Sequence, residues 1–199
     1  MNRTLLMTAL IATAAFGSSF AASAQTSAAN TTQRDVNQEQ RIENGLQNGT
    51  ITTRENAELQ RDEAHVDKLQ AKDLKNGSLS PAERAQLTAA QNKASRDIHT
   101  ATTNGINGNP LSASSQRAQA DTQRNINQQQ RINNGVKDGS LTNHEAASLE
   151  RGQSHVDKRE ARAGADGHVS AGEQRRIARA DNRQSARIHR QRHDAQVKG

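Results

Sequence analysis

Four octets of this chain carry oxygen-bearing side chains at a spacing that could hold a metal ion. Each reads Asn or Asp, Gly, any residue, an aliphatic residue, Ser or Thr, any two residues, and Glu. The four are NGTITTRE, NGSLSPAE, DGSLTNHE and DGHVSAGE, at positions 48–55, 76–83, 138–145 and 166–173. Carboxylate, amide and hydroxyl oxygens are ligands that Ca²⁺ prefers. The same residue types also begin helices, so the pattern has both a calcium interpretation and a structural one.

The octet resembles the second half of an EF-hand loop, where an oxygen ligand, a turn glycine, a backbone ligand and a closing bidentate Glu follow one another. This resemblance implies calcium ligands at Asn48, Thr52, Glu55, Asn134, Asp138, Ser140, Thr142, Glu145, Asp166, Ser170 and Glu173. The first half of the loop departs from the EF-hand pattern, because Asn44, Lys72, Asn134 and Arg162 stand where the opening carboxylate belongs. Calcium affinity rises with the number of carboxylates, so we expect only weak binding.

In the structural interpretation, the octets are helix starts. The predicted N-caps are Thr52, Ser80, Thr142 and Ser170, each followed three residues later by Glu, which is the capping-box pattern. The preceding Asn-Gly or Asp-Gly supplies the turn that ends the previous helix. The aliphatic residue then fits as a hydrophobic staple just before the cap. We favour this structural interpretation.

Two histidines near the C-terminus form a second candidate metal site. His189 and His193 stand four residues apart, which places two imidazoles on one face of a helix, where they could hold zinc, copper or nickel. Arg190 and Arg192 lie between and beside them and are unfavourable neighbours for a cation. We therefore favour a structural role for both histidines.

A group of arginines precedes these histidines. Four of them repeat at a spacing of four, which lies along one helix face, and three more flank the ladder: Arg175, Arg179, Arg183 and Arg187, with Arg176, Arg190 and Arg192. Such a stripe suits a polyanion, such as anionic envelope components or an acidic polysaccharide. The alternative is a solvated face that keeps a basic protein soluble. Because both Phe residues precede position 21, aromatic stacking on nucleic acid is excluded beyond it, and no sequence-specific nucleic-acid binding is expected.

The N-terminus has the layout of a secretory signal peptide. Arg3 precedes an apolar run over 5–16, and Ala22-Ser23-Ala24 is a small-residue cleavage site. We predict cleavage after Ala24 and a periplasmic or secreted protein without a transmembrane segment. The chain has no Cys, so no disulfide stabilises it. No nucleophile with a partner base and no cofactor fingerprint is visible, so we expect neither enzymatic activity nor a cofactor beyond weakly bound calcium.

The rest of the chain is an internal duplication. Residues 33–99 align with 123–189 without a gap, and 28 of the 67 positions are identical. The fold we predict is all-α, with two tandem three-helix, EF-hand-like units and partly disordered termini. The predicted order is a signal peptide at 1–24, a polar leader at 25–32, helical repeat 1 at 33–99, a flexible linker at 100–122, helical repeat 2 at 123–193 and a tail at 194–199. In repeat 1 the middle helix is expected over about 54–75 and the last over 81–99.

This organisation also resembles a group of small exported proteobacterial proteins that lack an assigned function. The residues that carry the resemblance are DGHVSAGEQ and SARIHRQRHD in repeat 2, at 166–174 and 185–194. The resemblance implies an envelope location and no reaction. Together with the missing catalytic residues and the basic stripe, it predicts an exported helical protein that acts by binding.

Overall fold

The computed structural model describes the backbone of residues 18–194 and the side chains of residues 28–194. All regular elements in this part of the chain are helices: α1 (Ser18–Asn48), α2 (Thr53–Asp73), the short 3₁₀ helix η1 (Leu74–Asn76), α3 (Pro81–Thr103), α4 (Ala113–Asp138), α5 (Asn143–Ala163) and α6 (Ala171–His193). None of the helices described is long and apolar enough to span a bilayer. Most of the predicted signal peptide and of the predicted tail lies outside the described residues.

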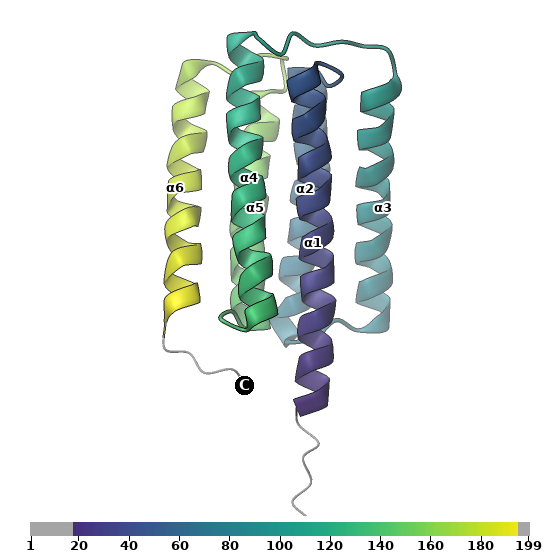
Figure 1. Cartoon of the computed structure of the whole chain (residues 1–199), viewed down its shortest axis with the longest axis vertical. Coiled ribbons are helices and arrows are strands. Elements are labelled where there is room, and N and C mark those ends of the chain that lie inside the picture. The colour runs from purple at the N-terminus through teal and green to yellow at the C-terminus, as the bar shows by residue number, and fades with distance from the viewer. Residues whose placement is uncertain (1–17, 195–199) are drawn as a thin grey trace, which may run out of the picture.

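The helices form one bundle to which both repeats contribute. Helix α1 packs along α4, and α2 packs along α5, so equivalent helices of the two repeats are direct neighbours. Figure 1 shows α1 and α4 running antiparallel in front of α2 and α5, with α3 and α6 on the two flanks. This pairing corresponds to an approximate twofold axis perpendicular to the helices. The all-α class is confirmed, whereas the arrangement as two tandem units is not.

The predicted flexible linker at 100–122 is mostly helical, which corrects the sequence-based boundaries. Helix α3 continues to Thr103, and Ser112 caps α4 by accepting a hydrogen bond from the Ser115 backbone N–H. The connection over 104–112 crosses the end of the bundle (Figure 1). Its backbone is held in place because the Gly108 N–H donates to the Gly49 carbonyl at 2.8 Å. Ser and Thr in this segment therefore act as helix and cap residues. The polar leader at 25–32 is likewise part of α1.

Each octet ends one helix and begins the next. The caps of α2, α3, α5 and α6 are Thr52, Ser80, Thr142 and Ser170, and each has the reciprocal capping box with the Glu three residues later. The octet glycines have positive φ, between 69° and 87°, which is the left-handed conformation that glycine adopts without steric cost. The chain therefore reverses direction at each octet.

In two of the four octets, the aliphatic residue packs backward onto the preceding helix. Ile51 lies against Gly45 and Leu141 lies against Gly135, so close that a Cβ on either glycine would come within 2.6 Å of the aliphatic side chain. The same pairs are joined by backbone hydrogen bonds of 3.0 and 2.9 Å to the glycine carbonyls. A glycine inside each helix thus provides the space for the turn that follows.

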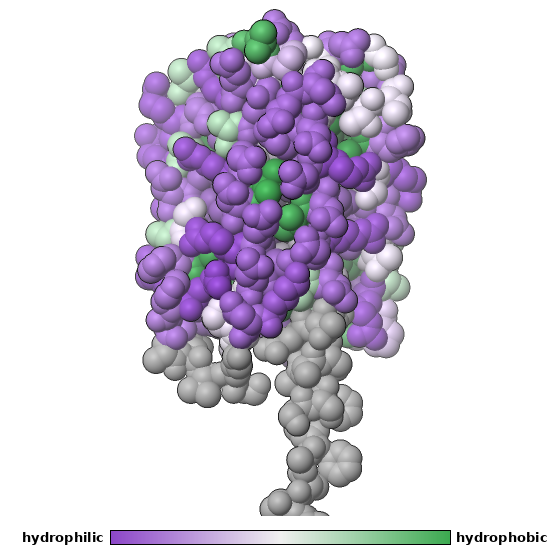
Figure 2. Space-filling model, in the orientation of Figure 1, coloured by the Kyte–Doolittle hydropathy of each residue, from purple (hydrophilic) through white to green (hydrophobic). Residues whose placement is uncertain are grey.

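The bundle interior is apolar in separate clusters and polar between them. One cluster joins the two repeats through Leu74, Leu79, Ile132, Val136, Leu141, Leu149 and Ile188. A second contains Ile42, Leu46, Ile51, Leu59 and Ile98. Buried carboxyl and amide side chains occupy the middle turns of the helices, among them Asp35, Glu39, Glu63, Asp67, Glu150, Asp157 and Glu160. The surface over α1 and α4 is almost entirely hydrophilic (Figure 2).

Candidate functional site

The oxygens proposed as calcium ligands serve the helix starts. Glu145 Oε2 accepts hydrogen bonds from the Thr142 backbone N–H and from Thr142 Oγ1, both at 2.8 Å. Asp138 Oδ1 accepts from the Ser140 backbone N–H at 2.8 Å, and its Oδ2 forms a 2.9 Å ion pair with Arg192. Asn134 is exposed on α4.

The other octets repeat this use of their oxygens. Glu55 accepts from Thr52, and Glu173 accepts from Ser170, in the same capping-box geometry. The side chains of Asn48 and Asp166 accept backbone N–H groups two residues ahead. Within the described residues no group of three His, Asp or Glu side chains is arranged to hold a metal ion.

The two C-terminal histidines stack on one another. The ring centroids of His189 and His193 lie 4.4 Å apart at an interplanar angle of 18°. His193 Nδ1 lies 2.8 Å from the His189 carbonyl oxygen, so one ring nitrogen already has a backbone partner. Both rings are exposed at the end of α6. The two imidazole rings therefore form a stacked pair at the C-terminal end of α6.

The arginine ladder of α6 is divided between different surroundings. Arg183 and Arg187 line a groove against α5, whereas Arg192 is engaged with Asp138. Arg176 lines a smaller cavity near the start of α6, together with Arg159 and Arg162 of α5. Arg175, Arg179 and Arg190 are exposed. The ladder is therefore not one continuous binding stripe.

The groove between α5 and α6 is a basic concave surface. It has a volume of about 420 Å³, and its charged or titratable lining residues are all basic: His155 and Arg159 from α5, and Arg183 and Arg187 from α6. The Arg187 guanidinium is oriented by hydrogen bonds to the Ser148 carbonyl and to Ser148 Oγ, at 3.2 and 2.9 Å. Arg183 has no ion-pair partner among the described residues.

The equivalent groove of repeat 1, between α2 and α3, is neutralised internally. There the Lys93 ammonium forms ion pairs of 2.7 Å with both Asp62 and Asp97. The alignment of the repeats places Arg183 at the position of Lys93, Gly152 at that of Asp62 and Arg187 at that of Asp97. Repeat 2 thus has the cation without either of the carboxylates that neutralise it in repeat 1.

A second cavity lies between α2 and α5, at the approximate twofold axis. It has a volume of about 560 Å³ and is lined from both repeats by equivalent residues, His65 with His155 and Lys68 with Lys158. In each HVDK segment, Val and Asp are buried while the His is exposed and the Lys lies at least partly at the surface. The Ser154 hydroxyl donates to the Ala64 carbonyl at 2.7 Å and holds α2 close to α5. We call this cavity the axial groove.

Positive charge concentrates around the imidazole that borders both cavities. The pKa of His155 is lowered, first by desolvation and then by the nearby charges of Lys158, Arg159, Arg151 and Arg187. A like charge disfavours the protonated imidazole. The field at this position therefore favours an anion.

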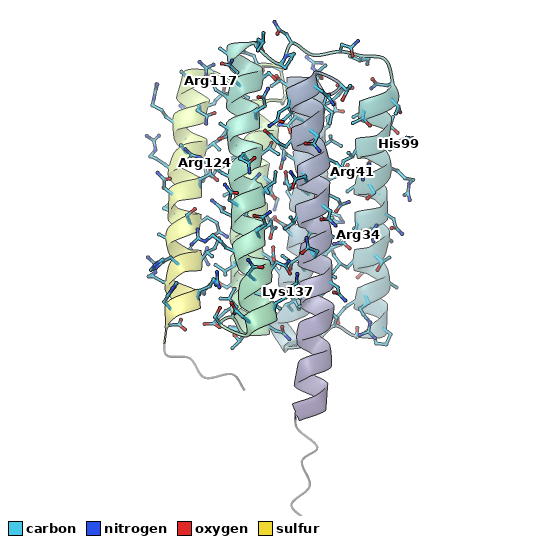
Figure 3. All side chains as sticks on the ribbon, in the orientation of Figure 1. Arg34, Arg41, His99, Arg117, Arg124 and Lys137 are labelled. Carbon is cyan, nitrogen blue, oxygen red and sulfur yellow. The ribbon has the colours of Figure 1, made fainter. Side chains whose placement is uncertain are left out.

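Sequence reasoning found the α6 half of this basic surface and missed the other half. The contributions of Arg151, Lys158 and Arg159 on α5, and of Lys68 and Lys72 on α2, depend on helix packing. Of these residues only Lys68 and Lys158 had a signal in the sequence, the repeated HVDK segment. The opposite face, over α1 and α4, carries separate basic residues such as Arg34, Arg41 and Lys137 (Figure 3).

Comparison of the chain with protein-family models, with curated proteins and with solved structures finds no match.

Proposed function

We propose that this chain is a non-enzymatic, exported helical protein that acts by binding, and that its ligand is a polyanion held in the groove between α5 and α6. The observation that carries the proposal is the replacement of Asp62 and Asp97 of repeat 1 by Gly152 and Arg187 of repeat 2. The cation of the repeat 1 groove is paired within the protein, whereas the cations of the repeat 2 groove face no carboxylate there and can meet an external anion.

The geometry supports charge-based binding rather than base or sugar readout. Arg159, Arg183 and Arg187 approach the groove from two helices, so an extended anion can meet guanidinium groups along its length. Arginine forms bidentate hydrogen bonds with carboxylate, sulfate-like and phosphate oxygens. An acidic polysaccharide or a phosphate-rich envelope polymer fits this chemistry, and the predicted export places the protein beside such polymers.

The proposal is tested by titrating heparin into the purified protein. The protein is expressed with its own N-terminal segment, and the form that the cell produces is used. We expect saturable binding that weakens steeply with salt, because counterions are released on binding. The variant Arg159→Gln/Arg183→Gln is expected to weaken binding at least tenfold and to flatten the salt dependence. Both side chains are exposed, so the fold should be retained.

The matched control is Arg61→Gln/Arg96→Gln, which removes the same charge from exposed positions on α2 and α3. It is expected to leave heparin binding nearly unchanged. Equal weakening by the two double variants would mean that net charge alone is responsible and would contradict a specific groove. Neutral dextran serves as the second control, and binding to it would also contradict the proposal.

A further inference from the structure

The axial groove combines an apolar floor with a positively charged rim. Leu69 and Ala71 contribute the floor, together with the methylene stems of the lysines around it, which can lie along apolar surface while their ammonium groups stay in water. The rim includes Lys68, Lys72 and Lys158. None of the described residues that line this groove is Asp or Glu. Its volume of about 560 Å³ lies within the range of small-ligand sites, roughly 300–1,000 Å³.

Packing across the approximate twofold axis produces this surface. Residues Val66 and Asp67 of α2 are buried, and so are the equivalent Val156 and Asp157 of α5. Since α2 lies along α5, the outward-facing His and Lys of the two HVDK segments meet at one groove. Each repeat therefore contributes one lysine of its HVDK segment to the rim, Lys68 and Lys158, whereas the carboxylates of the same segments are buried in the bundle.

An apolar floor alone would accept any hydrophobic molecule, and a basic rim alone would accept any anion. A groove with an apolar floor and a basic rim selects a molecule that is both hydrophobic and negatively charged. We propose that the axial groove binds a single-chain anionic amphiphile, with a hydrocarbon chain along Leu69 and Ala71 and a carboxylate among the lysines of the rim. This inference does not depend on the polyanion proposal, because it concerns a different cavity and requires apolar contact.

The direct test is calorimetric titration of the purified full protein with dodecanoate below its micelle-forming concentration. We expect saturable binding with one molecule per chain. Because each fully buried methylene contributes about fourfold to affinity, octanoate, with four methylenes fewer, is expected to bind about 250-fold more weakly if all four are buried and about sixteenfold more weakly if two are. Dodecylammonium, with the same chain and the opposite charge, is expected not to bind. Absence of dodecanoate binding, or equal affinity for octanoate, would overturn the proposal.

The location is tested by two variants and a matched control. Lys68→Gln/Lys158→Gln is expected to weaken dodecanoate binding about tenfold or more, and Leu69→Gln to weaken it by removing the apolar floor. Arg41→Gln/Lys137→Gln removes the same charge from the face over α1 and α4 (Figure 3) and is expected to have no effect. Equal weakening by the two double variants would overturn the site, as would unchanged affinity of the lysine variant.

Proton NMR supplies a readout that is independent of heat. Beyond position 20 the chain has no Phe, Tyr or Trp, so the histidine ring protons are the only aromatic signals from that part of the chain. Dodecanoate is expected to shift the signals of His65 and His155, which line the groove, and to leave His99 and His144 unshifted. Shifts spread over all histidines would contradict a single site. Binding only to anionic vesicles, with no response to monomeric dodecanoate, would show a membrane-docking face and would also overturn the proposal.

Discussion

Asp67 and Asp157 lie close enough together in the interior of the bundle that each changes the pKa of the other. They occupy equivalent positions of the two repeats, on α2 and α5, and the two residues are only 1% and 2% exposed. Two ionised carboxylates buried close together repel one another, which favours the protonated form of at least one of them. Burial and the neighbouring Asp157 raise the pKa of Asp67 well above its usual value, and burial raises that of Asp157 to about 7.

Around this pair, the two repeats exchange acids and amides at equivalent positions. In repeat 1 the Gln60 amide donates to the Glu39 carboxylate at 3.0 Å, whereas in repeat 2 Gln129 donates to Glu150 at 3.1 Å. Gln129 stands where Glu39 does, and Glu150 stands where Gln60 does. The same exchange relates the Asp35–Gln70 pair to the Asn125–Glu160 pair. Each of these four carboxyls thus has at least one amide donor, with the acid and the amide exchanged between the repeats.

The buried carboxyls predict a protein that is most stable in mild acid. Burial raises the pKa of Asp35 to about 7 and that of Glu150 to about 8, whereas both carboxyls titrate near 4 in an unfolded chain. The folded state holds these protons more tightly, so their contribution is fully present below about pH 4 and is lost as the pH rises through 7 to 8. Thermal melts followed by circular dichroism are expected to show a melting temperature that falls from pH 5 to pH 9. A melting temperature that rises over this interval would contradict the assignment.

Replacing one member of the central pair by its amide should remove part of that pH dependence. In Asp157→Asn one of the two buried acids can no longer ionise, so we expect a higher melting temperature at pH 8 and little change at pH 5. One kcal/mol corresponds to about 2–4 °C for a domain of this size, and a gain of several degrees is expected. The control Glu58→Gln alters an exposed carboxyl on the same helix as Asp67. A similar gain from that control would assign the effect to net charge.

The contact between Gly135 and Leu141 predicts that a single added methyl group destabilises the bundle. In Gly135→Ala the new Cβ would approach Leu141 Cδ1 to 2.5 Å. Alanine favours the helix by about 1 kcal/mol, but overpacking typically costs about 1–3 kcal/mol, so we expect a net loss of stability in urea unfolding. Gly172→Ala is the control, because at that position the nearest atom lies 3.8 Å away. A stabilised Gly135→Ala variant would contradict the packing.

The helix caps predict a local and moderate effect. Thr142 accepts the Glu145 backbone N–H at 3.2 Å and caps α5. Thr142→Ala is expected to lower the free energy of unfolding by about 1 kcal/mol, and Thr142→Ser by much less, because serine retains the hydroxyl acceptor. Chemical unfolding of both variants measures the difference. Equal losses in the two would show that the methyl group matters rather than the cap.

Calcium is expected to leave the protein unchanged. The carboxylates of Glu55, Glu145 and Glu173 are engaged by the N–H groups of their own caps, and calcium would have to displace those bonds. A ligand that binds only the folded state raises its melting temperature. We therefore expect the same melting temperature in millimolar calcium and in chelator. A melting temperature that is several degrees higher in calcium than in chelator would support the interpretation of the octets as ion-binding loops.

The sequence by itself determined that the chain is helical and where four of its helices begin. Asn/Asp-Gly followed by Ser/Thr and then Glu acts through hydrogen bonds between residues that are close in the chain, so Thr52 with Glu55 can be recognised as a cap from spacing alone. The duplication likewise identified α1 to α3 with α4 to α6. The linker was misjudged because Ser, Thr and Gly also occur in helices and caps, and Ser112 begins α4.

Only the tertiary structure decided which surfaces came together. The pairing of α2 with α5 joins positions 90 residues apart, and it both buries Asp67 against Asp157 and brings Lys68 beside the same groove as Lys158. A helical pattern indicates which face is apolar, but not which partner covers it. The buried carboxyls were also unexpected, because a charged residue in a polar sequence is normally assigned to solvent. Their burial follows from the packing of the two repeats, and amide side chains donate to four of them, Asp35, Glu39, Glu150 and Glu160.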